Sequence, residues 1–445
     1  MQAPTLTTAL LNHQVSLPLV MVVIGAIFLG TLAISRFSLR FGIPAVLGVL
    51  LFGLAINPRF ISVSHTSIEW IHTLTLAMLL FYAGLCTELA SIRGFLRYGL
   101  ILAFGGVLIS TLLLGLIIWA TASPNAGGIA LGFHQLPLTV ALLIAACLGS
   151  TDAGATISVL ESVGSSIPHR LRALVEFESS MNDPAAILFL GIVLTLSGGS
   201  LSRGKDVPTL LLEQVQLFVQ KLGSGLVLGL LLGVLASFCL NRLVRRKEEL
   251  LILGISLGML SYGISEMLGG SGLISVYITG LFLCNFHFSN SRITAASLQE
   301  TLLPFNTMTT ITVFLLFGIA MNPARLLPSL SEGGVAAAGL MLIARPLSVL
   351  AVQPWSPFNL RETALISWCG LRGAVPLALS LAAVDAIPTL PGIDQAAVSS
   401  LQTNAAGIVF TVVMLNLLLQ GLTLPHLSRW LGLPPDSLPP AAARR

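Results

Sequence analysis

Residues 143–160 read LIAACLGSTDAGATISVL and residues 177–194 read FESSMNDPAAILFLGIVL, two apolar runs that each carry one aspartate, Asp152 and Asp183. Runs of this length are typical of helices that cross a membrane, since the hydrocarbon core requires roughly 20 mainly apolar residues. A charged side chain at the bilayer centre costs roughly 3 kcal/mol or more, and membrane proteins keep such groups where ions or protons pass. The two aspartates therefore predict a membrane transporter that handles a cation and a proton.

The composition of the whole chain agrees with a membrane protein. Of its 445 residues, 55% are hydrophobic and only 9% are charged, which excludes a soluble domain of this size. The net charge of +4 is explained by basic loops and does not indicate a nucleic-acid partner. No Lys or Arg stands in the first 15 residues, so a secretory signal peptide is not expected. The five cysteines lack metal-ligand spacing, and we expect buried packing residues, no cofactor and no enzymatic activity.

Apolar runs long enough to cross a bilayer recur along the chain and predict an all-α polytopic membrane protein. A search for stretches of roughly 20 mainly apolar residues gives thirteen candidate spans. Their centres lie near residues 26, 50, 77, 110, 148, 185, 229, 257, 277, 311, 344, 373 and 413. The second and eighth runs are short, so twelve spans are the main alternative.

The basic residues in the loops distinguish these two counts, because Lys and Arg gather on the cytoplasmic side of membrane proteins. With thirteen spans, 15 of the 22 basic residues fall into alternate loops and the tail, and four fall into the intervening loops. The larger set is Arg36, Arg40, Arg93, Arg97, Arg170, Arg172, Arg242, Arg245, Arg246, Lys247, Arg292, Arg361, Arg429, Arg444 and Arg445. The smaller set is Arg59, Arg203, Lys205 and Arg325. We therefore expect thirteen spans, with the N-terminus outside and the C-terminus in the cytoplasm.

Two of the spans contain helix-breaking residues at their centres. The fifth holds GSTDAG at 149–154, and the twelfth holds GLRGAVP at 370–376. Glycine weakens a helix, and proline removes a donor and clashes with the preceding turn. Interrupted spans at matching positions of two halves indicate inverted repeats with the binding site at the breaks. The plainer alternative is that these glycines only allow close helix packing.

The expected domain organisation follows from these breaks. We predict one membrane domain over residues 1–425, with two repeats near 17–196 and 250–425 and a linker span near 218–240. Residues 426–445 are expected to form a short, disordered cytoplasmic tail.

The orientation places four charged side chains near the midplane. The sixth span is expected to begin near Leu174 at its cytoplasmic end, so Asp183 lies about 13.5 Å into it at 1.5 Å per residue. Asp152 lies about 15 Å from the cytoplasmic edge of the fifth span by the same rise. Arg345 in the eleventh span and Arg372 in the twelfth come out at similar depth. Four charges from four helices thus converge, and Arg372 is placed to offset the helix ends that meet at the breaks.

The sixth span presents its polar residues on two faces. Ser179 and Asp183 are four residues apart and share one face, which can address an ion site. Glu178 and Asn182 share another face, so Glu178 points into the protein. A buried carboxylate requires a cationic partner, which Arg345 or Arg372 can supply, and we favour Arg345.

Glu176 lies seven residues before Asp183 on the same face, nearer the cytoplasm. It lines an aqueous entrance to the site, or it is simply a solvated residue at the start of the helix; the sequence leaves both readings open.

These motifs together resemble those of the monovalent cation:proton antiporters of the Asn-Asp branch. Residues 176–184, EFESSMNDP, are similar to the family's "ExES..ND" signature, and Ser150 to Ala153 resemble its "TD" break. Leu342 to Pro346 resemble the "LIAR" span and residues 370–374 the "GLRGA" break. The variants resemble most the bacterial K⁺/H⁺ or Na⁺/H⁺ antiporters of the cell-volume-regulation type. Many of those relatives have Pro where this chain has Ala153, and a large cytoplasmic regulatory domain for which the sequence shows no counterpart.

The resemblance implies a homodimer in a bacterial inner membrane, in which a six-helix core moves like an elevator against a dimerisation domain. It implies an ion- and proton-binding site whose residues are Asp152, Asp183, Thr151, Ser179 and Asn182. It also implies that Glu178 and Arg345 form a structural ion pair. Asn182 stands where electrogenic relatives have Asp. The implied role of the protein is cation and pH homeostasis.

The chemistry of two buried carboxylates supports exchange of a monovalent cation for a proton. Burial disfavours a charged carboxylate, which either a proton or a dehydrated cation can neutralise. Carboxylate, hydroxyl and carbonyl oxygens suit Na⁺ or K⁺. Competition for one site then gives antiport, which we expect to be electroneutral. The alternatives are an organic-anion symporter of similar fold, which would favour paired basic groups, and a cation channel, which would need a continuous polar pore.

Overall fold

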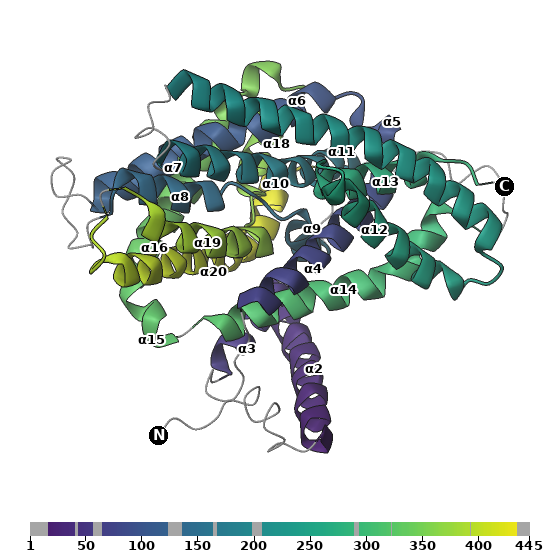
Figure 1. Ribbon diagram of the computed structural model, residues 1–445, viewed down its shortest axis with the longest axis horizontal. Helices are drawn as coiled ribbons and strands as arrows, with labels where there is room; N and C mark the ends of the chain where they lie inside the picture. Colours follow the sequence, from purple (N-terminus) through teal and green to yellow (C-terminus); the bar gives the residue numbers. More distant parts are fainter. Residues whose placement is uncertain are drawn as a thin grey trace.

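The computed structural model describes residues 17–40, 43–56, 65–122, 136–162, 167–197, 207–288, 293–321, 323–391 and 393–433. Every regular element in these ranges is helical, which confirms the all-α class (Figure 1). Four of the basic loop residues (Arg59, Arg203, Lys205 and Arg292) and tail residues 434–445 lie outside the described ranges.

The helices of the first half are α2 (Leu17–Arg40), α3 (Ala45–Ala55), α4 (His65–Cys86), α5 (Leu89–Ile92), α6 (Leu96–Ile101), η1 (Leu102–Gly106), α7 (Val107–Ala122), α8 (Leu138–Cys147), α9 (Ala153–Ser162), α10 (His169–Ser197) and α11 (Val207–Leu243). Those of the second half are α12 (Glu249–Met267), α13 (Gly272–Asn285), α14 (Ala295–Ala320), α15 (Pro323–Leu326), η4 (Leu327–Ser329), α16 (Leu330–Gly339), η5 (Leu340–Ala344), α17 (Arg345–Ala351), η6 (Gln353–Trp355), α18 (Leu360–Trp368), α19 (Ala374–Ala386), η7 (Ile387–Thr389) and α20 (Val398–Trp430).

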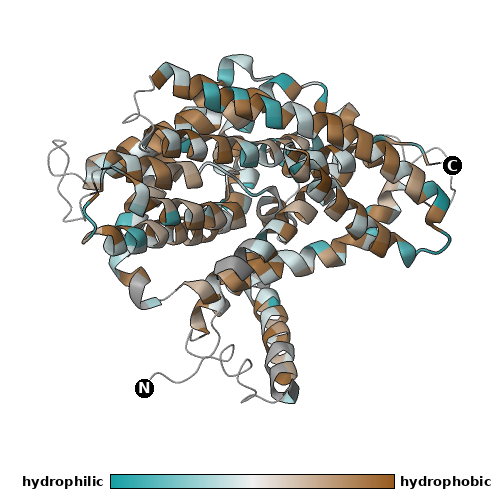
Figure 2. Cartoon of the chain, in the orientation of Figure 1, coloured by the Kyte–Doolittle hydropathy of each residue, from teal (hydrophilic) through white to brown (hydrophobic). Residues whose placement is uncertain are grey.

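The hydrophobic lengths of these helices fit a membrane protein. In the described part of the chain, seven helical stretches are long and apolar enough to cross a bilayer. Six further apolar helices are shorter, among them α3, α8 and α13. Many large apolar side chains are exposed, as expected for a protein whose solvent is lipid. Hydrophobic residues, brown in Figure 2, occupy much of the length of the helices. The count of thirteen spans stays a prediction.

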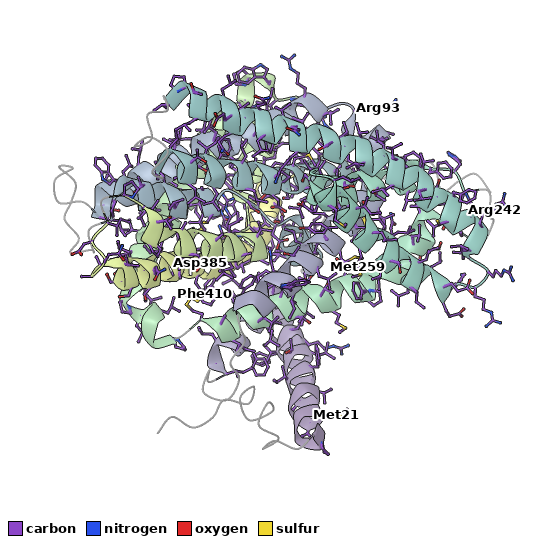
Figure 3. The ribbon with its side chains drawn as sticks, viewed as in Figure 1. Met21, Arg93, Arg242, Met259, Asp385 and Phe410 are labelled. Atoms are coloured by element: carbon purple, nitrogen blue, oxygen red, sulfur yellow. The ribbon has the colours of Figure 1, made fainter. Side chains whose placement is uncertain are left out.

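The helices form two groups. The first, which we call the scaffold group, consists of α2, α3, α4 and α11 to α14, which pack on one another. The second, the core group, consists of α7 to α10 and α16 to α20, with α16, α19 and α20 side by side (Figure 1). The long helix α11 runs along one edge of the molecule and also contacts α10 of the core group. Met21 lies at the far end of α2, which projects from the body and packs on α3 (Figure 3).

Glycine allows the closest helix contacts in the scaffold group. A Cβ on Gly84 of α4 or on Gly280 of α13 would overlap a backbone carbonyl of the facing helix. Gly53 of α3 and Gly318 of α14 meet in the same way. Small residues at helix contacts are typical of membrane bundles, where dispersion and close approach replace the hydrophobic effect.

The structure interrupts both of the spans in which the sequence predicts a break. Residues 148–152 separate α8 from α9, and residues 369–373 separate α18 from α19. Each break leaves backbone groups without helical partners near the middle of the core group. The alternative that the glycines serve only close packing is therefore wrong.

Three helices extend further than the sequence indicates. Helix α10 begins at His169 instead of near Leu174, and α11 covers Val207–Leu243 instead of 218–240. Helix α20 continues to Trp430, so the expected tail from residue 426 was placed too early. Proline 425 removes one helical donor, but Arg429 Nε donates to its carbonyl and helps to hold the following turn.

Candidate functional site

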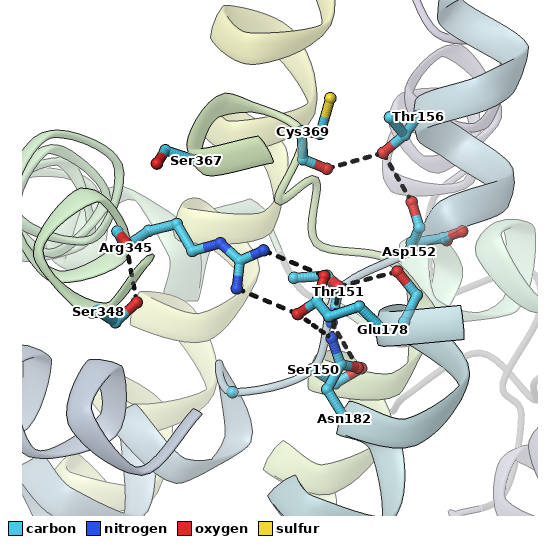
Figure 4. A network of polar contacts seen from close by, with 12 residues as sticks. Ser150, Thr151, Asp152, Thr156, Glu178, Asn182, Arg345, Ser348, Ser367 and Cys369 are labelled. Carbon is cyan, nitrogen blue, oxygen red and sulfur yellow. Dashed lines mark hydrogen bonds and ion pairs between the residues drawn. The ribbon is translucent and has the colours of Figure 1, made fainter. Parts of the chain in front are cut away.

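The two breaks cross and are hydrogen-bonded to each other. The backbone N–H of Asp152 donates to the carbonyl of Leu371 (2.7 Å). Thr156 Oγ1 donates to the carbonyl of Cys369 (3.0 Å) and to that of Asp152 (2.9 Å), as Figure 4 shows. A Cβ on Gly373 would overlap the carboxylate of Asp152, so only glycine fits at this point. Unpaired backbone groups of one break are thus satisfied by the other.

One of the two aspartates ends the first break, and the other lies on α10 beside it. Asp152 precedes α9, and its Oδ1 accepts from the N–H of Ala155 (3.0 Å), which is the arrangement of a helix N-cap. Asp183 is 5% exposed on α10, and its Oδ1 accepts a hydrogen bond from the hydroxyl of Ser150. Among the residues that the structure describes, neither carboxylate forms an ion pair.

Thr151 connects the break to the polar face of α10. Its Oγ1 lies 3.0 Å from Ser179 Oγ, and its backbone N–H donates to Asn182 Oδ1 (3.2 Å). Ser150 thus bonds directly to Asp183, and Thr151 bonds to Ser179, which lies one helical turn before Asp183 on α10. Ser150 is a site residue that the sequence did not predict.

The face of α10 that carries Glu178 forms a buried ion pair. Arg345 donates from Nη1 and Nη2 to the two oxygens of Glu178, both at 3.1 Å, in a bidentate arrangement (Figure 4). Asn182 Nδ2 donates to Glu178 Oε1 (3.0 Å) and to Thr151 Oγ1. Arg345, the partner favoured from the sequence, is thus the arginine that contacts Glu178. Asn182, which the sequence predicts at the ion site, links the ion pair to the break through these two bonds.

Arg372 has a different set of partners at the crossing. Its Nη1 donates to the carbonyls of Gly149 (2.8 Å) and Ser150 (2.6 Å), which follow the C-terminal end of α8. A cation is favourable there because the helix dipole concentrates negative charge at that end. Arg372 is therefore placed where its positive charge can offset the negative end of the α8 dipole, as the sequence predicts.

Two residues of α20 complete the second break and were missed by the sequence analysis. Asn416 Oδ1 accepts from the backbone N–H of Arg372 (2.7 Å), and Asn416 Nδ2 donates to Gln420 Oε1 (2.7 Å). The sequence did contain a signal for them. Two amide side chains four residues apart in an apolar span are costly to bury in lipid, so they indicate hydrogen-bond partners inside the protein.

Glu176 lies apart from these contacts. It pairs with Arg172 one turn earlier on α10 (3.1 Å), and its side chain is 20% exposed. The structure therefore leaves it closer to the solvent than Asp183, in line with either of the two readings from the sequence.

The site offers oxygen ligands. In the described part of the chain, no three His, Cys, Asp or Glu side chains form a group that could hold a metal ion. Carboxylates, hydroxyls and unwound carbonyls are hard ligands, which suit an alkali cation.

Crossed helix breaks with paired carboxylates between them define a secondary transporter. Comparison with known proteins makes this specific: residues 23–430 match the family described as "Sodium/hydrogen exchanger, transmembrane", and the chain belongs to this family. The family predicted from the motifs is confirmed, and the protein is a membrane transporter and not an enzyme.

Two groups of relatives carry names with different ions. The chain is 34% identical over 413 residues to the K(+)/H(+) antiporter NhaP2 of Shewanella sp. (strain MR-4), covering 91% of this chain and 66% of that protein. It is 31% identical over 407 residues to the Na(+)/H(+) antiporter NhaS2 of Synechocystis sp., covering 88% of this chain and 67% of that protein. The chain thus spans about two thirds of the length of the curated relatives it matches.

A solved structure of similar fold is the sodium proton antiporter MjNhaP1 from Methanocaldococcus jannaschii. Its TM-score is 0.71 at 21% identity, with 90% of this chain and 99% of that chain covered. At this identity the likeness establishes the fold alone. The comparisons do not support a channel or an organic-anion symporter, the two alternatives that the sequence had left open.

Proposed function

We propose that the protein is an antiporter that exchanges Na⁺ or K⁺ for protons across the membrane. The observation that carries this proposal is the pair Asp152 and Asp183, set among hydroxyl groups at the crossing of two broken helices. Family membership and the names of the relatives support the same activity. The transported ions are the only small molecules we assign to the site.

The exchange follows from competition at this site. With the cation bound, Asp152 and Asp183 supply the negative charge, and the hydroxyls of Thr151 and Ser179 supply neutral ligands. When the cation leaves, a proton on Asp183 takes the place of its positive charge, because two bare carboxylates are unfavourable in so buried a place. A site that crosses the membrane only when it holds either the cation or the proton moves one ion against the other.

Glu178 and Asn182 take supporting roles in this proposal. The Glu178–Arg345 pair serves as a structural ion pair, because one guanidinium satisfies both oxygens of the carboxylate. Asn182, with its amide shared between Glu178 and Thr151, positions the break instead of binding the ion. Arg372 stabilises the end of α8.

The remaining expectations from the sequence belong to the same proposal. We propose thirteen spans in a bacterial inner membrane with the N-terminus outside and the C-terminus in the cytoplasm. We also propose a homodimer in which the core group moves like an elevator against the scaffold group, and a role in cation and pH homeostasis. Glu176 would then line the cytoplasmic entrance to the site.

The test is transport in proteoliposomes loaded with a fluorescent pH indicator. Addition of Na⁺, K⁺ or Li⁺ to the wild-type protein should move protons, and the response to each ion gives the selectivity. Asp183→Asn should abolish proton movement with little change in stability, since it removes the exchangeable charge and keeps the size. Asp394→Asn, which alters an exposed aspartate, is the matched control and should exchange like the wild type. Normal exchange by Asp183→Asn would refute the proposal.

A further inference from the structure

We infer that Asn416 is a positioning residue that controls the ion site from behind the second break, with Gln420 fixing its orientation. The inference rests on the proposed exchange function and adds to it a helix, α20, that contributes no charged residue to the site. Its effect passes through Arg372 to the backbone that carries Ser150, the hydroxyl that bonds to Asp183.

The orientation of the Asn416 amide is determined by chemistry. A backbone N–H can only donate, so the atom that faces the N–H of Arg372 at 2.7 Å must be the amide oxygen. The amide nitrogen of Asn416 then faces Gln420, whose side-chain oxygen must accept at 2.7 Å. Both side chains are 1% exposed. Gln420 thus holds Asn416 in the orientation that Arg372 requires.

The position of the Arg372 backbone decides where its guanidinium reaches. The N–H of Arg372 is bound to α20, while Nη1 spans the crossing to the carbonyls of Gly149 and Ser150. The hydroxyl of Ser150 in turn donates to Asp183. A continuous series of hydrogen bonds therefore runs from Gln420 through Asn416, Arg372 and Ser150 to the carboxylate that exchanges its ion.

A purely structural role for this pair would look different. Polar side chains that only join membrane helices bond to side chains or carbonyls of a neighbouring regular helix. Asn416 instead satisfies a donor that the break in α18–α19 leaves without a helical partner. On the same helix, Asn404 is an example of the ordinary case, because it bonds to the side chain of Ser329 (3.0 Å) away from both breaks.

Loss of Asn416 should therefore change the properties of the ion site in addition to stability. Without the acceptor, the backbone of Arg372 is no longer held against α20, and its guanidinium holds the carbonyl of Ser150 less firmly. The hydroxyl of Ser150 is then less well placed to donate to Asp183. We expect the apparent KM for the cation to rise about fivefold to tenfold, the size of effect of one buried hydrogen bond. At a fixed cation concentration the pH of half-maximal exchange should move to the alkaline side, since a cation that binds more weakly competes less well with protons for the site.

The experiment measures cation KM and pH profile in proteoliposomes for four purified proteins: wild type, Asn416→Leu, Asn416→Asp and Asn404→Leu. Asn416→Leu keeps the volume and removes the acceptor, so it should show both shifts. Asn416→Asp keeps an oxygen towards Arg372 and should recover most of the cation affinity. Asn404→Leu, the matched control, should reduce thermal stability and leave KM and pH profile unchanged.

The outcomes separate this inference from the proposed function. A wild-type protein that exchanges no cation refutes the proposed function, whatever the variants do. Exchange by the wild type together with unchanged KM and pH profile in Asn416→Leu refutes the inference alone, as do equal shifts in Asn404→Leu. If Asn416→Leu does not fold, Gln420→Met serves in its place, because it leaves Asn416 present but unoriented. It should then show the same shifts to a smaller degree, and their absence would equally refute the inference.

Discussion

Two carboxylates five residues apart on α10, Glu178 and Asp183, are buried to a similar extent but have opposite kinds of partner. Glu178 meets a bidentate arginine and an amide, so each of its oxygens is engaged by a charged or polar donor. Asp183 accepts a hydrogen bond from the hydroxyl of Ser150, two residues before a second carboxylate, Asp152. A fully compensated charge is fixed, whereas an incompletely compensated one is open to a proton or a cation. One helix thus carries both the permanent and the exchangeable charge of the protein.

The largest expected effect concerns the permanent charge. Glu178→Ala should lower the free energy of unfolding by about 3 to 5 kcal/mol, because it leaves Arg345 charged, buried and unpaired. The same loss is expected for Arg345→Ala. A double-mutant cycle measured by thermal unfolding in detergent should show strong coupling between Glu178 and Arg345.

The control for this cycle is Arg372→Ala combined with Glu178→Ala. Because Arg372 bonds to backbone carbonyls at the end of α8, the coupling should be much smaller. Stronger coupling of Glu178 to Arg372 than to Arg345 would contradict the distinction between the two arginines.

A second change tests the space beside the exchangeable charges. Gly373→Ala places a methyl group where the carboxylate of Asp152 lies, so the two breaks must separate or Asp152 must turn away. Overpacking of this kind costs roughly 1 to 3 kcal/mol, and we expect exchange to fall by at least about tenfold. Transport assays on the purified variant measure this loss.

Gly334→Ala is the control, because a Cβ at that glycine of α16 meets open space. It should exchange like the wild type. Full activity of Gly373→Ala would mean that Asp152 does not need its position against the second break.

The sequence is informative about this comparison because the signals are local. Gly-rich interruptions of apolar runs are visible in the sequence itself, and they predict both breaks. Charged residues within apolar runs are equally visible, and they predict the convergence of Asp152, Asp183, Glu178 and Arg345. The periodicity of a helix separates the faces of Ser179 and Glu178. These features follow from the cost of charges in lipid and from helix geometry, which do not depend on distant parts of the chain.

Other features depend on packing that the sequence does not reveal. Asn416 meets Arg372 across 44 positions of the chain, and the bonds of the Asn182 amide to both Glu178 and Thr151 depend on how α10 packs against the first break. Helix ends are misjudged where polar residues continue a helix. Helix α11 begins at Val207 and runs through Glu213, so hydropathy places its start too late, and α20 passes Pro425, so hydropathy ends it too early.

The smallest expected effect is the response of transport to voltage, and it rests on how many exchangeable charges α10 carries. Asn182 is neutral, and its amide is engaged by Thr151 and Glu178, so this helix offers Asp183 as its exchangeable acid. If Asp152 and Asp183 share one cation that one proton replaces, the loaded site carries the same charge in both directions. Exchange in potassium-clamped liposomes, driven by Na⁺, should therefore proceed at the same rate with and without valinomycin. Asn182→Asp should not make it voltage-dependent, because the new acid would face Glu178 and chiefly weaken the ion pair. A clear acceleration or reversal by voltage in the wild type would mean that a second proton moves, with Asp152 as its carrier. Asp152 would then be an exchangeable acid like Asp183, in contrast to Glu178 in its ion pair with Arg345.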